Sequence, residues 1–471
     1  MAKRTSSSSP LGLLTLLATI TVCKFHVLGM CGVEPGSSSP PDYSTLLFAT
    51  APTTTPSGRV YGVTSYGADP SGEEDSTGAI MEAIRDALNG PSEGFLFAGI
   101  RNLGGARIDL QGGTYVVSRP LNFPLPGRGN LIIHGGTLKA SENFPAEGYL
   151  LDLSPTTSGG GPAYNYEFIT FKDILLDSNF RGGGIQVVNS LRIGIDNCYI
   201  THFTTNGILV RGGHETYIKN SFLGQHITAG GDPDERKFTG TAIDLSGNDN
   251  AVTDVVIFSA QVGVAISGQA NLLSGVHCYN KATGFGGTGI YVKVPGNTQT
   301  RIVNCYMDYT GIVAEDPVQL HVSNSFFLGD AFVELKSVHG TIAGVNIVDN
   351  MFAGSGKDID IVQLDQKLAP FKNIEQVVVE RNNVRGMNLK STVGTGGARG
   401  NGTMWTVDLN RVLLFPNLAT FVQYTFKSSE SSFPKHVLRN MSDNRVVIES
   451  DMPVTAEVFV TVDQSKSSVI N

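Results

Sequence analysis

A repeated strand pattern between Gly184 and Ile361 constrains the fold of this chain more than any other feature. Eight short apolar segments follow one another at steps of about 21 to 27 residues, with one longer step of about 35 before Ile243. The segments span residues 184–187, 207–210, 242–245, 263–266, 289–292, 311–314, 332–335 and 358–361. A fixed period in this range predicts a solenoid, whose repeats bury their apolar faces only by stacking on their neighbours.

A second motif follows each segment after about a dozen residues and supports the same period. In it, an Asn or His comes shortly before an aromatic or apolar residue. The examples are Asn197, Asn220, His277, Asn304, Asn324 and Asn350. Asn tolerates the left-handed backbone of a repeated turn, and stacked amides can hydrogen-bond along the axis. Two strand positions in each coil, with glycine at the bends, predict an all-β fold, a right-handed parallel β-helix.

The N-terminal residues read as targeting and linking segments. Lys3 and Arg4 precede an apolar run over residues 11–23, which predicts a secretory signal peptide over residues 1–29. The run is too short to span a bilayer comfortably, so a membrane anchor is the weaker alternative. Residues 30–58 are rich in Ser, Thr and Pro and predict a linker. We therefore expect a secreted, extracellular protein with no membrane segment after the signal is removed.

The β-helix is expected over residues 59–400, with different structure at its two ends. A helix that starts at Asp75 or Ser76 and runs to Asn89 has one apolar face, which suits it to cap the open end of a solenoid. Residues 401–471 lose the period and alternate in polarity, so they predict a β-rich C-terminal extension.

The cysteines and glycosylation motifs add smaller expectations. Cys198, Cys278 and Cys305 follow the second motif, and we expect them at one place in their coils. Cys278 and Cys305 fall on neighbouring coils, within reach of a disulfide at a spacing of ~4.8 Å, but buried free thiols are the favoured reading. Asn401 and Asn440 begin glycosylation sequons. The cysteine and histidine spacings match no metal site, so no metal is expected.

Charge limits the partners of the chain. The formal net charge is −8 at pH 7, and only 16% of the residues are charged. Such a chain is not a nucleic-acid binder by bulk charge, and a site for any polyanion must be locally basic.

Chemistry is expected on the outward face of the repeated strands, where alternate residues form one long column. The column holds Gln186, Leu209, Asp244, Ala265, Tyr291, Val313, Glu334 and Asp360. Asp244 is the acid nearest its middle. The long step before it adds a segment with Asp232, Asp234 and Glu235, which we expect to overhang Asp244, because insertions in a solenoid map to loops on one face.

Paired carboxyls at this place suit glycoside hydrolysis. Inversion requires an acid and a base ~6.5–9.5 Å apart, and retention requires ~5 Å. Asp244 is the first candidate, and its partner is Asp232, Asp234, Glu235 or the turn residue Asp249. A solvated charged loop is the alternative reading. The residues expected to bind substrate are Arg181, Arg211, Lys237, Lys293, Tyr291 and Gln261.

Two stretches resemble a known family. Residues 66–72 with 75–77 resemble the opening of pectin-lyase-like β-helix proteins. The stretch from Thr239-Gly240-Thr241-Ala242-Ile243-Asp244-Leu245 to 287–290 is similar to plant polygalacturonases of the quartet type, which are linked to the separation of pollen tetrads. The likeness covers about residues 59–465. It implies a secreted cell-wall hydrolase that cleaves α-1,4-galacturonan in pectin as a monomer, without a cofactor.

The motifs of ordinary polygalacturonases are only partly present. When their motifs are aligned with this chain, the last Asp of the first motif is kept as Asp244, and the inner Asp of that motif is replaced by Thr241. Their Asp-Asp pair falls on Gln261 and Val262, and their His falls on Thr288. Two alternatives therefore stay open: β-elimination with a Lys or Arg base and Ca²⁺ held by acids, and a non-catalytic pectin-binding wall protein.

Overall fold

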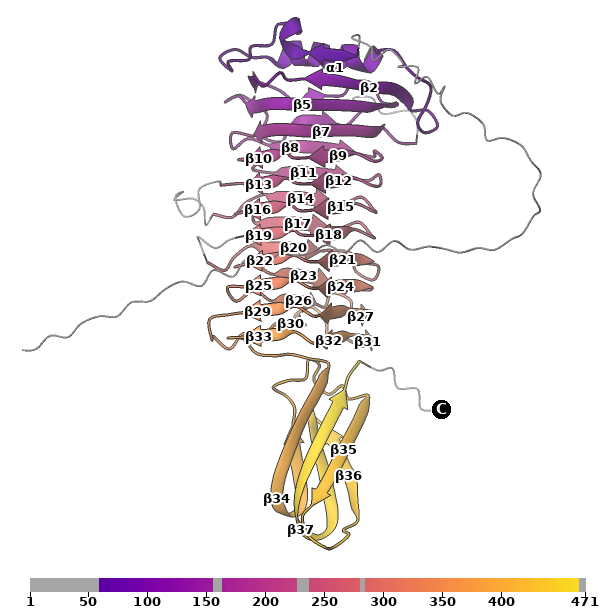
Figure 1. Cartoon of the computed structure of the whole chain (residues 1–471), viewed down its shortest axis with the longest axis vertical. Coiled ribbons are helices and arrows are strands. Elements are labelled where there is room, and N and C mark those ends of the chain that lie inside the picture. The colour runs from indigo at the N-terminus through magenta and orange to yellow at the C-terminus, as the bar shows by residue number, and fades with distance from the viewer. Residues whose placement is uncertain (1–58, 156–162, 227–236, 280–283, 466–471) are drawn as a thin grey trace, which may run out of the picture. The chain divides into compact units, whose positions relative to one another are not determined.

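The described part of the chain is built almost entirely of β-strands (Figure 1). The computed structural model describes residues 59–155, 163–226, 237–279 and 284–465. The signal peptide and linker expected over residues 1–29 and 30–58 lie outside these ranges. Within the described ranges, no helix is long and apolar enough to cross a membrane.

Each coil contributes three short strands, and equivalent strands of successive coils pair in parallel (Figure 1). In one coil these are β14 (Thr241–Leu245), β15 (Ala251–Thr253) and β16 (Val256–Phe258). β14 pairs in parallel with the equivalent strands of the coils before and after it. The predicted parallel β-helix is confirmed, with a third strand in each coil beyond the two expected.

The strands fall into three rows. The first row is a 10-stranded sheet made of β4 (Leu121–Asn122), β6 (Tyr149–Leu153), β8 (Gly183–Val188), β11 (Asn206–Arg211), β14, β17 (Val262–Ile266), β20 (Thr288–Val292), β23 (Ile312–Glu315), β26 (Val333–Lys336) and β30 (Val362–Asp365). The second row holds β9 (Gly194–Asp196), β12 (Tyr217–Lys219), β15, β18 (Leu272–Ser274), β21 (Thr300–Val303), β24 (Leu320–Ser323), β28 (Asn346–Val348) and β32 (Val378–Glu380). The third row holds β10 (Tyr199–Thr201), β13 (Phe222–Gly224), β16, β19 (His277–Tyr279), β22 (Tyr306–Asp308), β25 (Phe326–Leu328), β29 (Met351–Ala353) and β33 (Asn383–Arg385).

The second and third rows belong to one 21-stranded sheet, which also includes five strands of the first coils. These are β1 (Val60–Gly62), β2 (Arg101–Asp109), β3 (Thr114–Val117), β5 (Arg128–Ala140) and β7 (Tyr166–Asp177). A small separate sheet pairs β27 (Thr341–Ala343) with β31 (Asn373–Glu375).

The core is a stack of inward side chains, one from each coil. In the first row the stack is formed by Ile185, Ile208, Ile243, Val264, Ile290, Ile312, Val333 and Val362, all buried. Because each member of the stack is covered by the members before and after it, a single repeat could not bury its own apolar face.

A turn between the second and third rows uses a left-handed residue in every coil. Its members include Asn197, Asn220, Asp254, Gly275, Asn304, Asn324 and Asp349, with φ between 52° and 67°. The expected role of Asn is confirmed at four of these positions. The left-handed backbone is wrong for His277 and Asn350: His277 pairs with Tyr306 in the register, two residues beyond the turn, and Asn350 follows the turn residue Asp349. The Asn350 amide does bond along the axis, to Asn382 Oδ1 at 3.1 Å.

The three described cysteines are buried free thiols, as favoured by the sequence. They do not all occupy one place in their coils. Cys278 lies within β19 opposite Met307, whereas Cys305 immediately precedes β22, two places earlier in the register. The shared Cys-Tyr dipeptide suggested an alignment that the hydrogen-bonded register does not follow.

The predicted capping helix is confirmed as α1 (Thr77–Asn89), which follows the short 3-10 helix η1 (Val63–Tyr66). Ser76 occupies its N-cap position, and the Asp75 carboxylate accepts a hydrogen bond of 3.0 Å from the Thr77 backbone N–H. The buried residues of α1 include Ile80, Ala83, Ile84, Ala87 and Leu88, which belong to the core of the β-helix.

The C-terminal extension is a four-stranded antiparallel sheet with its own apolar core. Its strands are β34 (Val393–Asp408), β35 (Phe421–Ser428), β36 (His436–Ser442) and β37 (Arg445–Asp463). Leu414 and Phe415, from the connection between β34 and β35, are buried in the core of the β-helix instead.

Candidate active site on the first row of strands

The first row presents an outward column of side chains in continuous register. The column runs through Asp152, Gln186, Leu209, Asp244, Ala265, Tyr291, Val313, Glu334 and Gln363. The expected column is confirmed from Gln186 to Glu334. The predicted place of Asp360 in the column is wrong, because the last strand of the row begins at Val362 and Gln363 is the partner of Glu334.

A second outward row lies beside this column, at the C-terminal ends of the strands. This row holds Arg211, Ser246, Ser267 and Lys293. The backbone N–H groups of the last three each donate to a carbonyl of the preceding coil, which continues the register of the strands to these residues. The Ser267 hydroxyl donates to the Ser246 Oγ at 3.0 Å. The two serines were not predicted from the sequence, although they lie in the same place as Arg211 and Lys293, two residues beyond the outward column.

Asp244 lies half-buried between these cations. Burial raises the pKa of its carboxyl above the ordinary value. The Ser246 hydroxyl, which donates to Oδ1 at 3.3 Å, and the charges of Lys293 and Arg211 act in the opposite direction but do not cancel the effect of burial. The carboxyl therefore keeps its proton to a higher pH than an exposed Asp does.

Tyr291 is held in place by a charged cluster on the neighbouring coils. Its hydroxyl donates to Glu315 Oε1 at 2.6 Å and accepts from Lys336 Nζ at 3.1 Å. Lys336 also pairs with Glu315 at 2.8 Å. Burial opposes ionisation of Glu315, but the hydrogen bonds from Lys336 and Tyr291 hold its pKa below the ordinary value. The Lys293 ammonium lies 4.3 Å from the centre of the Tyr291 ring, a cation–π contact.

The other three predicted binding residues lie at the opposite edge of the row, where the strands begin. Arg181 Nε donates to the Phe144 carbonyl at 2.5 Å. Gln261 is exposed just before β17, and Lys237 is exposed four residues before β14. Arg211, Tyr291 and Lys293 are thus grouped on the Asp244 side, and Arg181, Lys237 and Gln261 are separate from them.

The expected carboxyl partners Asp232, Asp234 and Glu235 lie outside the described residues. Asp249 is described: it is exposed, and its Oδ2 lies 3.1 Å from His214 Nδ1. Asp152 and Glu334 share the column with Asp244 but lie three and four strands away. At ~4.8 Å per strand these are separations of ~14 and ~19 Å, beyond the ~6.5–9.5 Å that hydrolysis uses.

Two further predicted features concern modification and metals. Asn401 in β34 and Asn440 in β36 both have exposed side chains, as glycosylation requires. Within the described ranges, no three His, Cys, Asp or Glu side chains are grouped so that they could hold a metal ion.

Known proteins resemble this chain over most of its length. The family described as "Rhamnogalacturonase A/epimerase, pectate lyase-like" matches residues 60–314. The polygalacturonase QRT3 of Arabidopsis thaliana is 64% identical over 417 residues, which cover 88% of this chain and 86% of that protein.

Solved structures are more distant. The endo-xylogalacturonan hydrolase of Aspergillus tubingensis has 14% identity and a TM-score of 0.49, and the match covers 70% of this chain and 95% of that one. The DFA-IIIase of Arthrobacter chlorophenolicus has 13% identity and a TM-score of 0.45, with 69% and 84% covered. On the family match and the 64% identity to QRT3, this chain belongs to the polygalacturonase family, the pectin-degrading glycoside hydrolases among the pectate lyase-like proteins.

Proposed function

We propose that the protein hydrolyses α-1,4-galacturonan on the face of the first row, with Asp244 as the general acid. The observation that carries this role is the raised pKa of a half-buried carboxyl that lies between two cations. A general acid must hold a proton at the working pH and release it to the glycosidic oxygen as the bond breaks.

The two cations beside Asp244 favour a polyuronate as the substrate. Arg211 lies one strand before Asp244, and Lys293 lies two strands after it. Each sugar of a galacturonan carries a carboxylate, and charge-assisted hydrogen bonds to such groups are stronger than those between neutral partners. A chain bound along the helix axis therefore presents carboxylates to Arg211 and Lys293 while a glycosidic oxygen lies over Asp244.

The general base is proposed to be one of Asp232, Asp234 and Glu235. Their segment leads into β14 through Lys237, so it joins the strand that carries Asp244. A carboxylate there would take a proton from the attacking water, at the ~6.5–9.5 Å separation that inversion uses.

Secretion to the cell wall is part of the same proposal. It rests on the basic and apolar pattern of residues 1–29, on the exposed sequons at Asn401 and Asn440, and on membership of a family that degrades pectin.

The test is the rate of release of reducing ends from de-esterified galacturonan. Asp244→Asn should lower kcat by about a hundredfold or more, the usual loss of a general acid. Asp152→Asn is the matched control, because Asp152 lies in the same column, has a pKa raised by burial and is followed by the same Leu-Ser pair, but no cation of the described residues contributes to its pKa. Equal rates for Asp244→Asn and the wild type would remove Asp244 from the site.

Variants of the segment before β14 identify the base. One of Asp232→Asn, Asp234→Asn and Glu235→Gln should lose activity as severely as Asp244→Asn, and the other two should keep most of it. Full activity in all three would show that the base lies elsewhere.

A further inference from the structure

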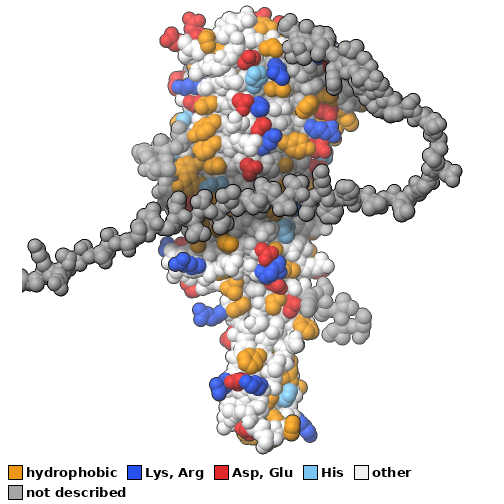
Figure 2. All heavy atoms as spheres, viewed as in Figure 1, with side chains coloured by type: hydrophobic (Ala, Val, Ile, Leu, Met, Phe, Trp, Pro, Cys, Tyr) orange, Lys and Arg blue, Asp and Glu red, His pale blue; other side chains and the backbone are white. Residues whose placement is uncertain are grey.

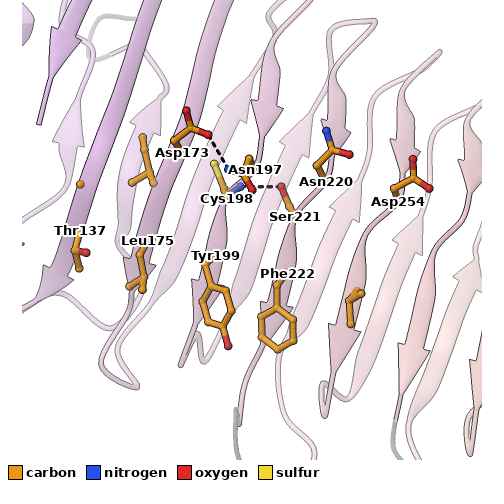
Figure 3. A pocket seen from close by; sticks show the side chains of 13 residues that line it. Thr137, Asp173, Leu175, Asn197, Cys198, Tyr199, Asn220, Ser221, Phe222 and Asp254 are labelled. Carbon is orange, nitrogen blue, oxygen red and sulfur yellow. Dashed lines mark hydrogen bonds between the residues drawn. The ribbon is translucent and has the colours of Figure 1, made fainter. Parts of the chain in front are cut away.

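A second extended groove lies on the 21-stranded sheet, on strands that do not carry Asp244 (Figure 3). It has a volume of about 590 Å³ and crosses β5, β7, β10, β13 and β16. Along one side lie the side chains of the left-handed turn, Asp173, Asn197, Asn220 and Asp254, and along the other lie Thr137 of β5, Leu175 of β7, Tyr199 and Phe222 (Figure 3).

The apolar side of the groove holds two aromatic rings between Leu175 and Val256. Tyr199 and Phe222 are opposite each other in the register, and their rings stack at 4.4 Å with an angle of 16° between them. The same outward position in later coils holds Val256, His277, Tyr306 and Phe326. Figure 2 shows this face, with apolar side chains on both sides of a line of acidic and basic ones.

The polar side repeats with the coils. Asp173, Asn197, Asn220 and Asp254 are successive members of the left-handed turn, and their side chains lie in one line (Figure 3). Asn197 Nδ2 donates to Asp173 Oδ1 at 2.7 Å, and all four side chains are exposed to solvent. The groove therefore offers carbonyl and carboxylate oxygens once per coil beside a line of mostly apolar side chains.

The charges of the groove disfavour a polyanion. Among the described residues, those that line the groove include two carboxylates, Asp173 and Asp254, and no Lys or Arg. The exposed lysines near the groove lie opposite carboxylates in the register. Lys139, on β5, is opposite Asp177. Lys172 and Lys219, in the adjacent row, are both opposite Asp196, and Lys219 pairs with it at 3.5 Å. Burial lowers the pKa of His277 to about 4, so its ring adds no positive charge to this face of the sheet at neutral pH.

We propose that this groove binds a neutral linear polysaccharide and holds the protein on the wall while the Asp244 face acts on galacturonan. Sugar rings pack their C–H faces against aromatic rings, and their hydroxyls donate to amide and carboxylate oxygens. A polymer also matches the groove because both repeat by translation, here at ~4.8 Å per coil. This site is independent of the proposed hydrolysis, because it shares no residue with the first row.

The test is retardation of the native full-length protein in electrophoresis gels that contain a soluble polysaccharide. The probes are hydroxyethylcellulose, as a neutral β-1,4-glucan, and polygalacturonate. The wild type should be retarded by the glucan, and the Tyr199→Ser/Phe222→Ser double variant should lose at least tenfold in affinity. The matched control is Tyr217→Ser, since Tyr217 is equally exposed on β12 of the same sheet but lies outside the groove.

A second variant tests the charge argument. Asp173→Asn/Asp254→Asn keeps side chains that tolerate the left-handed turn, so it should fold, retain the glucan and gain retardation by polygalacturonate. Hydrolysis of soluble galacturonan should be unchanged in both double variants, which separates this site from the Asp244 face. The proposal is overturned if the glucan does not retard the wild type, or if Tyr217→Ser loses as much affinity for the glucan as Tyr199→Ser/Phe222→Ser does. It is also overturned if Tyr199→Ser/Phe222→Ser loses affinity for polygalacturonate instead of the glucan.

Discussion

At the scale of single residues, the surroundings of a carboxyl decide its chemistry more than its local sequence does. Asp152 and Asp244 both precede a Leu-Ser pair, both lie in the outward column of the first row, and burial raises the pKa of both. Of the two carboxyls, only that of Asp244 is near enough to Arg211 and Lys293 for their charges to affect its pKa. In the proposed mechanism the two cations bind carboxylates of the substrate, and burial of Asp244 keeps its proton in place to a higher pH.

The raised pKa of Asp244 makes a prediction about stability. Between the ordinary pKa and the raised one, the folded state binds more protons than the unfolded state, so the free energy of unfolding falls as pH rises through this window. Asp244→Asn removes the carboxyl that causes this loss of stability. The variant should therefore gain stability relative to the wild type as pH rises from about 4 to 7.

Urea unfolding at several pH values measures this effect, with Asp443→Asn as the control in an exposed turn of the C-terminal sheet. A stability difference between Asp244→Asn and the wild type that shrinks as pH rises would contradict the assignment.

At the scale of elements, buried amides tie each coil to the next. Asn250 and Asn271 are almost fully buried, and Asn271 Oδ1 accepts bonds of 3.0 Å from both the backbone N–H and the side-chain amide of Asn250. Asn271 Nδ2 donates to the Gly268 carbonyl at 2.9 Å. Each amide thus satisfies backbone groups that the bend of the coil leaves without a strand partner.

Asn271→Ala should lower the free energy of unfolding by about 1–3 kcal/mol, because it leaves buried donors of Asn250 without an acceptor. Thermal and urea unfolding measure the change. Asn346→Ala is the control, since Asn346 is half-exposed within β28. A similar small loss for both variants would show that the buried amides are not special.

The sequence predicts the repeat well, because burial of one stack forces a fixed period, but it does not reveal every strand. The second-row strands such as β12 and β15 are mostly three residues long with a single buried residue, so no alternation is visible in them. Residues 358–361 mimic the apolar alternation, yet Asp360 bonds to Asn388 and the strand begins later. Hydrogen-bonded register, which the sequence does not contain, decides both cases.

The residues of the candidate site also differ in how well the sequence predicts them. Asp244 and its column are predictable from strand alternation, and Arg211 and Lys293 from their place beside it. Ser246 and Ser267 lie in the same outward row as Lys293, but only a cation carries the charge that points to a uronate, so the sequence gives no reason to select the two serines.

At the scale of the whole molecule, the stacked coils give the chain two long faces of different charge. The first row combines Asp244 with cations, and the groove of the larger sheet combines aromatic rings with carboxylates. Both faces repeat along the same axis, so each suits a polymer. Because they draw on different rows of strands, substitutions on one face are expected to leave the other intact.

Hydrolysis of galacturonan on the first row is best tested by analysis of the products formed from de-esterified galacturonan. We expect saturated oligogalacturonides with new reducing ends, formed without added Ca²⁺ and lost in Asp244→Asn. Unsaturated products that absorb in the ultraviolet and disappear with a chelator would contradict it, as would pectate binding with no product after long incubation.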